Sequence, residues 1–297
     1  MDEKEFIVDV NGERADIAAS RLSGETRSLI LSLFDKNLVL VNGKIVKKST
    51  KLKIGDKLHL TIPPEELPDL TPKNIEFEIL LDKENYAIIN KPAGLTVHPA
   101  PGNYSDTLVN ALLYTFTIED EDNDFRPGIV HRLDKDTSGV MIIAKNAKYR
   151  MILSELFSKR QIVKKYTAIC QGNPTFIEKT IELPIGRDKY NRQKMKVIDN
   201  GKYAKSHFKV IEKFSNAFLT EVEIFTGRTH QIRVHASNMG HPLVGDVLYG
   251  GKVINDFNRQ ALHSSYIEFT DPDTLSLIQI SSELPKDMTD LLNFLRK

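Results

Sequence analysis

Short apolar runs of strand length recur along the chain after residue 75. The runs cover residues 77–82, 86–91, 139–145, 162–171, 204–214, 217–225 and 277–282. Helical periodicity interrupts them at residues 106–116, 145–159, 228–239 and 286–297. The strands outnumber the helices and do not alternate regularly with them, which disfavours a doubly wound parallel sheet. We therefore expect an α+β fold with a mixed, largely antiparallel sheet.

The first 64 residues predict a separate, small α/β domain. Residues 23–37 show helical periodicity, with Ser23 as a possible N-cap. Asn42-Gly43 lies between two runs rich in β-branched residues, a pattern that predicts a hairpin. The stretch PPEELPDLTPKN that follows has the proline-rich, acidic composition of a linker. We therefore place a small domain at residues 1–64, a linker at 65–74 and the main domain at 75–297.

The composition limits the class of protein. A chain of 297 residues is long for a single core, so we expect one large domain and one smaller domain. The hydrophobic fraction of 40% and the charged fraction of 27% are typical of a globular protein. Its single cysteine, Cys170, excludes a disulfide framework and disfavours a thiolate zinc site. Because Cys170 lies in the apolar run YTAIC, we expect it to be buried and inert. No apolar stretch is long enough to span a bilayer, and the acidic start MDEKEF is unlike a targeting peptide, so we expect a cytoplasmic protein.

The net charge is only +1, but the basic residues are unevenly distributed. One basic region lies between Lys36 and Lys57, and a second lies between Arg160 and Lys209. Lysine-rich turns are commonly no more than solvated surface. Two basic regions on a nearly neutral chain nevertheless favour a polyanionic partner, whose phosphates supply non-specific affinity.

The segment GIVHRLDKDTSGVMIIAK holds several ionisable residues between two apolar runs. His131, Arg132 and Asp134 lie in the short connection that these runs anchor in the core. For an isolated aspartate, a buried salt bridge with no further role is the usual interpretation. Asp136, before Thr137-Ser138-Gly139, is typical of a turn. The role of Asp134 therefore depends on what the rest of the chain places beside it.

A second dense segment, TGRTHQIRVHASNMGHPLVGDVLYG, spans Thr226 to Gly250. On a helix that begins near Arg228, Arg228 and Gln231 would share one face, as would Thr229 and Arg233. Arg233 could then reach a carboxylate in a forked pair and hold it in its ionised form.

No part of the sequence predicts a metal or a nucleotide cofactor. His230, His235 and His241 are spaced five and six residues apart, so they do not share one face of a helix as the HExxH pair does. The proline- and glycine-containing loop at residues 90–99 matches neither GxGxxG nor GxxxxGKS. We therefore expect chemistry that needs neither ATP, a dinucleotide nor a metal ion.

Five segments, taken in order, resemble the motifs of the RluA-type pseudouridine synthases. They are NKPAGLTVHP, GIVHRLDKDTSGVMIIAK, KKYTAICQG, GKYAKSHFKV and TGRTHQIRVHASNMGHPLVGDVLYG. The resemblance covers the chain from about Ile75 to Phe269, and the combination of HRLDxxTSG with GRTHQIRVH and GHPLVGDxLYG is highly specific. The first domain is similar to an S-four-type RNA-binding module, joined to the rest as in the RluD-like branch of that family.

The resemblance implies an enzyme that converts uridine in RNA to pseudouridine without a cofactor. The N-glycosidic bond is cut, the uracil rotates, and a carbon–carbon bond forms from carbon 5. By motif, Asp134 would be the catalytic carboxylate, acting either covalently or by stabilising an oxocarbenium-like state while a glycal forms. Arg233 would pair with Asp134, while Tyr166 would stack on the base and offer its hydroxyl for removal of the carbon-5 proton. Leu133 and Ile232 would wall the base pocket.

The resemblance also implies contacts with RNA. A uridine in a stem must be flipped out, and Arg132 would fill the space that it leaves. The other residues expected to contact RNA are His131, Lys164, Arg228, His230, Gln231, Lys44, Lys47 and Lys48. The expected partner is large-subunit rRNA, with tRNA next, and we expect a monomer. Two alternatives remain: an RNA-binding or ribosome-assembly factor that keeps the fold without turnover, and a metal-dependent hydrolase built on the histidines.

Overall fold

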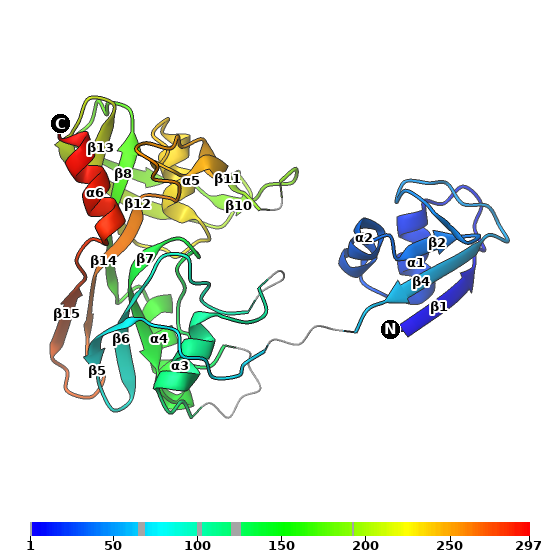
Figure 1. The fold of residues 1–297 in the computed structure, drawn as a ribbon, viewed down its shortest axis with the longest axis horizontal. Helices are drawn as coiled ribbons and strands as arrows, with labels where there is room; N and C mark the ends of the chain where they lie inside the picture. Colours follow the sequence, from blue (N-terminus) through cyan, green and yellow to red (C-terminus); the bar gives the residue numbers. More distant parts are fainter. Residues whose placement is uncertain (1, 65–68, 100–102, 120–125, 192) are drawn as a thin grey trace. The chain divides into compact units, whose positions relative to one another are not determined.

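The computed structural model describes residues 2–64, 69–99, 103–119, 126–191 and 193–297 of the protein (Figure 1). The chain forms two compact units, residues 1–67 and residues 68–297.

Unit 1 is a small antiparallel sheet with two helices. Its elements are β1 (Asp2–Ile7), α1 (Ala15–Ser23), α2 (Arg27–Asp35), β2 (Val39–Val41), β3 (Lys44–Ile45) and β4 (Lys57–Ile62), with the strands in the order β1-β4-β2-β3. Its core includes Ile30 and Leu33 of α2 and Leu58 and Leu60 of β4. The expected hairpin is confirmed, since β2 and β3 pair across Asn42-Gly43 and both turn residues have positive φ.

The helix expected over residues 23–37 begins later than its sequence pattern indicates. Thr26 is the N-cap of α2, and its side chain accepts a hydrogen bond from the Leu29 amide. Ser23 instead ends α1, a helix that we did not expect from the sequence, and Gly24 follows in the left-handed conformation that closes it. Ser23 as an N-cap was therefore wrong, because two short helices meet where the pattern indicated a single one.

Unit 2 is built on a nine-stranded mixed sheet. Its strands are β5 (Glu78–Asp82), β6 (Tyr86–Lys91), β7 (Ser138–Ala144), β8 (Val163–Gln171), β9 (Glu178–Glu182), β12 (Lys205–Lys213), β13 (Ala217–Ile224), β14 (Leu262–Thr270) and β15 (Leu277–Ser281). The order is β5-β6-β7-β14-β8-β13-β12-β9, with β15 on β14. Only β7 and β14 pair in parallel among these strands. The expected α+β fold with a largely antiparallel mixed sheet is confirmed.

Helices cover both faces of this sheet. Residues of α3 (Leu108–Thr115) and α5 (Gln231–Asn238) pack into one core with alternate residues of β6, β7 and β8. Residues of α4 (Ala147–Ser158) and α6 (Lys286–Leu295) pack against the opposite face. The run SGVMIIA of β7 is buried throughout, because this strand is covered on both sides.

The strand β14 lies at the centre of the sheet, although no apolar run predicted it. Its polar residues bond directly to β7: the His263 ring lies 2.9 Å from the Ser138 hydroxyl, and the Ser264 hydroxyl donates to the Val140 carbonyl. At Gly139 the backbone of β14 approaches so closely that a Cβ atom would lie 2.2 Å from the Ser264 oxygen. Polar residues thus occupy a central strand because hydrogen bonds to β7 satisfy them.

The stretch expected to be a linker is attached to unit 2 where the structure describes it. The Asp69 amide donates to the Tyr104 carbonyl, and the Lys73 amide donates to the Asn110 carbonyl. The Asn110 side chain donates to the carbonyls of Asp69 and Thr71. Residues 65–68 of the expected linker lie outside the described residues.

Cys170 is fully buried in β8, where burial raises the pKa of its thiol above the ordinary value. Among the helices of the described residues, none has the length and the apolar composition that a membrane crossing requires.

Candidate active site

A cavity of about 360 Å³ opens in unit 2 beside the two dense sequence segments. The residues 130–134 and 227–233 line it, together with Thr137, Phe157, Ser158, Lys164, Tyr166, Ile224 and Leu262. The structure therefore brings together the segments around Asp134, Tyr166 and Arg233, although they are far apart in the sequence.

Asp134 lies in a connection that is braced from several sides. The Thr137 amide donates to the Asp134 carbonyl, which closes a turn within the connection. Arg259 donates a hydrogen bond from Nη1 to the Asp136 carbonyl at 3.0 Å. The Gly94 amide donates to the Lys135 carbonyl. These bonds hold the backbone from Asp134 to Thr137, directly after the carboxylate.

Lys91 provides a further brace from within the core. Its side chain is fully buried, and its Nζ donates to the carbonyls of Pro92, Leu95 and Lys135 at 2.7, 2.9 and 2.9 Å. Burial lowers the pKa of Lys91 to about 7. The three carbonyl acceptors work in the other direction, because only the ammonium form has three N–H groups to donate. Lys91 thus joins the loop after β6 to the backbone beside Asp134.

Arg233 connects two carboxylates at one wall of the cavity. Its Nη1 lies 3.0 Å from Oδ2 of Asp134. Its Nε and Nη2 form a forked pair with Asp246, at 2.7 and 2.8 Å. Although burial lowers the pKa of Arg233, the hydrogen bonds to Asp246 and the charge of Asp134 raise it above its ordinary value. The expected pairing of Arg233 with Asp134 is present, but the fork is made with Asp246, which the sequence did not single out.

His230 lies on the other side of the Asp134 carboxylate. Its backbone is left-handed, with φ of 56°, at the residue preceding α5. Its Nδ1 lies 2.8 Å from the Tyr249 hydroxyl, which accepts a hydrogen bond from the Met195 amide. The Tyr249 proton is therefore free to donate to Nδ1, which leaves the histidine proton on Nε2, 3.7 Å from Oδ2 of Asp134. Burial lowers the pKa of His230, which favours the neutral ring.

The helix expected from about Arg228 begins at Gln231 instead. Arg228 lies in the preceding turn, where its Nε donates to the Tyr203 carbonyl. The Gln231 side chain accepts from Thr226 and from the Arg228 amide, and it donates to two groups at the start of β12. These bonds use both the oxygen and the nitrogen of the amide within the protein, so the expected RNA contact of Gln231 is not one that the structure favours.

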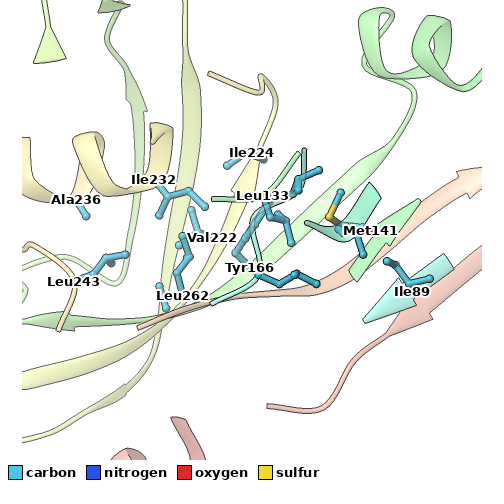
Figure 2. Packing of buried hydrophobic residues seen from close by; sticks show 14 of the residues in the cluster. Ile89, Leu133, Met141, Tyr166, Val222, Ile224, Ile232, Ala236, Leu243 and Leu262 are labelled. Atoms are coloured by element: carbon cyan, nitrogen blue, oxygen red, sulfur yellow. The ribbon is translucent and has the colours of Figure 1, made fainter. Parts of the chain in front are cut away.

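Apolar side chains form the rest of the cavity. Tyr166, Leu133 and Ile232 are all more than nine-tenths buried and line it together with Ile224 (Figure 2). Burial raises the pKa of Tyr166 above its ordinary value, and the charge of Asp134 adds to this effect. The phenol is therefore protonated at neutral pH.

The basic residues expected to contact RNA differ in their surroundings. Arg132 is exposed and lines the cavity. His131 accepts a hydrogen bond on Nε2 from the Ile142 amide, and burial lowers its pKa to about 3, so it is a neutral residue tied to β7. The three lysines of unit 1 that were expected to contact RNA are exposed and lie on β3 and just after it: Lys44, Lys47 and Lys48.

The histidines that suggested a metal do not converge. His235 bonds to Ser206 and to the Leu183 carbonyl, and His241 bonds to the Gln171 carbonyl. Across residues 2–64, 69–99, 103–119, 126–191 and 193–297, no group of three or more His, Cys, Asp or Glu side chains is arranged to hold a metal ion.

Comparison with known proteins shows the family. A family model for RNA pseudouridylate synthase matches residues 85–238. The uncharacterized RNA pseudouridine synthase YlyB of Bacillus subtilis is 40% identical over 287 residues, which are 96% of this chain and 95% of that protein. The chain belongs to the RluA-type family of RNA pseudouridine synthases. It is therefore an isomerase that acts on RNA.

Two further comparisons support the assignment of this synthase. The ribosomal large subunit pseudouridine synthase D of Pseudomonas aeruginosa is 40% identical over 303 residues, which are 97% of this chain and 94% of that protein. The solved structure of human RNA pseudouridylate synthase domain containing 4 matches with a TM-score of 0.59 and 27% identity. It covers 74% of this chain and 93% of its own. The fold and the RluD-like assignment expected from the sequence are confirmed.

Two residues that shape the site of the synthase were not predicted from the sequence. Asp246 and Tyr249 lie in the quoted motif GHPLVGDVLYG, but no role was assigned to them. The sequence signal for Asp246 was a single acid after an apolar run and a glycine. In the structure, Gly245 has φ of 75°, and a Cβ atom at this position would lie 2.1 Å from the Arg259 carbonyl oxygen. Such a glycine indicates a tightly packed turn, and the acid that follows such a turn is held in place.

Proposed function

We propose that the synthase converts a uridine of large-subunit ribosomal RNA to pseudouridine, with Asp134 as the catalytic carboxylate. The observation that carries this proposal is the 3.0 Å contact between Oδ2 of Asp134 and Nη1 of Arg233, at the wall of a cavity that Tyr166 also lines. The choice of RNA is supported by the similarity to the Pseudomonas aeruginosa protein, which is named as a large-subunit synthase.

In the proposed mechanism, the target nucleotide leaves its helix and its base enters the cavity between Leu133 and Ile232. Oδ2 of Asp134 is held by Arg233 and faces the His230 ring. No side chain of the described residues forms a hydrogen bond with Oδ1. Oδ1 is therefore the oxygen available to approach the ribose. It either bonds to carbon 1′ or removes the 2′ proton to give a glycal, and both routes need the ionised carboxylate.

Tyr166 supports the flipped base by stacking in this proposal. Stacking needs no ionisation, which agrees with the raised pKa of the buried phenol. As a base toward the carbon-5 proton, the phenol must pass its own proton on to an acceptor. Asp134 is the acidic side chain that the described part of the chain places in the same cavity.

Activity on ribosomal RNA tests the proposed substrate. We expect the purified synthase, without added cofactor, to release tritium from large-subunit rRNA labelled at carbon 5 of uridine. The rRNA must come from cells that lack the synthase, so that the target is unmodified. Mapping of pseudouridine in cells with and without the protein should then show a missing position in that rRNA. A position lost only from tRNA would contradict the rRNA proposal and leave the catalytic one intact.

Unit 1 is proposed to act as an S-four-type RNA-binding module through Lys44, Lys47 and Lys48. Replacing all three by glutamine should weaken binding to structured rRNA, because contacts with phosphates are lost. The slope of log affinity against log salt concentration should also become shallower, by about 0.7–0.9 for each lost phosphate contact. The measurement is a salt titration of RNA binding by both proteins. Turnover of a short oligonucleotide that reaches only unit 2 should not change. An unaltered salt slope would contradict the proposed role of these lysines.

A further inference from the structure

One wall of the active-site cavity holds a lysine for which the described chain supplies no counter-charge. Lys164 is 8% exposed and lines the cavity. Its Nζ lies 5.4 Å from the centre of the Phe157 ring, and no other described residue forms a hydrogen bond or an ion pair with it. Burial lowers the pKa of Lys164 to about 8, which reflects the cost of an ammonium group with little hydration.

Other lysines of unit 2 show how unusual this arrangement is. Lys91 is more deeply buried, but three carbonyl oxygens surround its Nζ. Lys165, the neighbour of Lys164 in β8, pairs with Glu221 at 3.3 Å, and its side chain is 34% exposed. Leaving a buried charge without a partner costs several kcal/mol, on the order of the penalty for breaking a buried ion pair. A buried cation with a perturbed pKa at a cavity wall is typical of a site that a ligand completes.

The position of Lys164 on β8 relates it to the proposed place of the base. Lys164 and Tyr166 are two residues apart on a strand, so their side chains point to the same face with about 7 Å between their Cα atoms. Both are buried and both line the cavity. A uracil ring that rests on Tyr166 therefore has one edge within reach of the flexible Lys164 side chain.

Asp134 and Lys164 lie at different parts of the cavity. Asp134 contacts Arg233 at 3.0 Å and lies 3.7 Å from His230, whereas the Nζ of Lys164 lies 5.4 Å from the centre of the Phe157 ring. Lys164 lowers the pKa of His131, beside Phe157. The cavity is thus anionic where the ribose would lie and cationic along the strand from Tyr166. This polarity matches the charges that develop when the glycosidic bond breaks, positive on the ribose and negative on the base.

We propose that the Lys164 ammonium donates a hydrogen bond to a carbonyl oxygen of the flipped uracil and stabilises the negative charge of the detached ring. The inference rests on the proposed function, in which Asp134 acts at the ribose. When the bond between carbon 1′ and N1 breaks, both electrons stay with the ring, and the charge spreads to its carbonyl oxygens. The Asp134 carboxylate then either bonds to carbon 1′ or removes the proton from carbon 2′, which gives a glycal. Carbon 5 then bonds to carbon 1′ as the ester bond to Asp134 breaks or, in the glycal route, as Asp134 returns the proton to carbon 2′. The carbon-5 proton passes to solvent and N1 takes up a proton from solvent, while Lys164 keeps all of its protons.

A phosphate is a poorer fit for Lys164 than the base. Arg132 is exposed and Arg228 partly exposed, and both line the same cavity. They can contact the RNA backbone while it stays in solvent. Lys164 is buried among Phe157, His131 and Tyr166, where a phosphate would lose its hydration.

The test compares two substrates in single-turnover reactions, one with uridine and one with 5-fluorouridine at the target position. The readout is loss of the original N-nucleoside after complete digestion of the RNA. We expect Lys164→Met to slow the uridine reaction by about 10²–10³-fold, as removal of a donor to a developing anion does. The loss should be much smaller for 5-fluorouridine, because fluorine itself withdraws charge from the ring. Lys164→Arg should recover most of the rate on both substrates.

Lys165→Met is the matched control, because it removes the same group from the neighbouring residue on the other face of β8. It should leave both rates near those of the wild type. Thermal melting shows whether each variant is folded, and Lys164→Gln takes the place of Lys164→Met if the latter does not fold.

Two results would overturn the inference. Equal losses on both substrates, with weaker binding and a shallower salt dependence, would assign Lys164 to a phosphate. A Lys164→Met protein as fast as the wild type would show that the ammonium has no role in turnover. Asp134→Asn is measured in the same assay: if it is inactive while Lys164→Met is fully active, only the Lys164 inference fails, whereas an active Asp134→Asn overturns the proposed function itself.

Discussion

Replacing Asp134 by asparagine is expected to abolish tritium release from carbon-5-labelled RNA, with a loss of about 10⁴-fold or more, as for the removal of other catalytic nucleophiles. The amide has the shape of the carboxylate, and its oxygen can still accept the hydrogen bond from Arg233 that Asp134 accepts at 3.0 Å. The charge is lost, however, and with it the ability to bond to carbon 1′ or to remove the 2′ proton. The measurement is single-turnover release of tritium, together with binding of the same RNA.

Asp136→Asn is the control for this experiment. Asp136 lies two residues away, and it is the backbone carbonyl of Asp136 that accepts the bond from Arg259. The Asp136 side chain does not line the cavity. The control variant should therefore retain turnover, and both variants should bind RNA as the wild type does. Equal release by Asp134→Asn and the wild type would exclude Asp134 as the catalytic carboxylate.

Much of the fold followed from local patterns in the sequence. The apolar runs that became β6, β7 and β8 are buried strands, and the motif between the first two of them carries Asp134. The strand β14 could not be found in this way, because its residues His263 and Ser264 satisfy their polar groups through bonds to β7. Those partners are more than a hundred positions away in the sequence, so no local pattern reports them.

The sequence predicted the site residues that belong to a recognisable motif. It did not predict the partners that these residues contact in space. Arg233 was expected to pair with a carboxylate, but the fork to Asp246 depends on the turn at Gly245. His230 was expected to contact RNA, whereas its left-handed backbone and the Tyr249 hydroxyl direct its ring toward Asp134. Strand alternation alone places Lys164 beside Tyr166. Only the packed structure shows that no described residue supplies Lys164 with a counter-charge.

Replacing Asp246 by asparagine is expected to reduce both the stability and the activity of the synthase. The Asp246 side chain is 1% exposed and that of Arg233 is 8% exposed, so the variant leaves a buried guanidinium without the carboxylate that it faces. Breaking such a pair costs about 3–5 kcal/mol. For a unit of this size, the melting temperature should fall on the order of 10 °C. The measurement is thermal unfolding of both proteins at the same pH and salt concentration.

Asp287→Asn provides the matched control, since Asp287 also forms a forked pair with an arginine, Arg259, at 2.6 and 2.9 Å. The Asp287 side chain is 47% exposed, so water screens its attraction to Arg259. The free energy of unfolding of this variant should therefore fall by less than about 1 kcal/mol, the usual range for exposed pairs. Asp246→Asn should also slow turnover at temperatures where the variant remains folded. Arg233 donates three side-chain hydrogen bonds, two to Asp246 and one to Asp134, so Asp246 orients the guanidinium toward Asp134. Equal melting temperatures for the two variants would show that burial does not strengthen the pair between Arg233 and Asp246. An Asp246→Asn protein with full turnover would show that catalysis by Asp134 does not depend on the orientation that Asp246 gives to the Arg233 guanidinium.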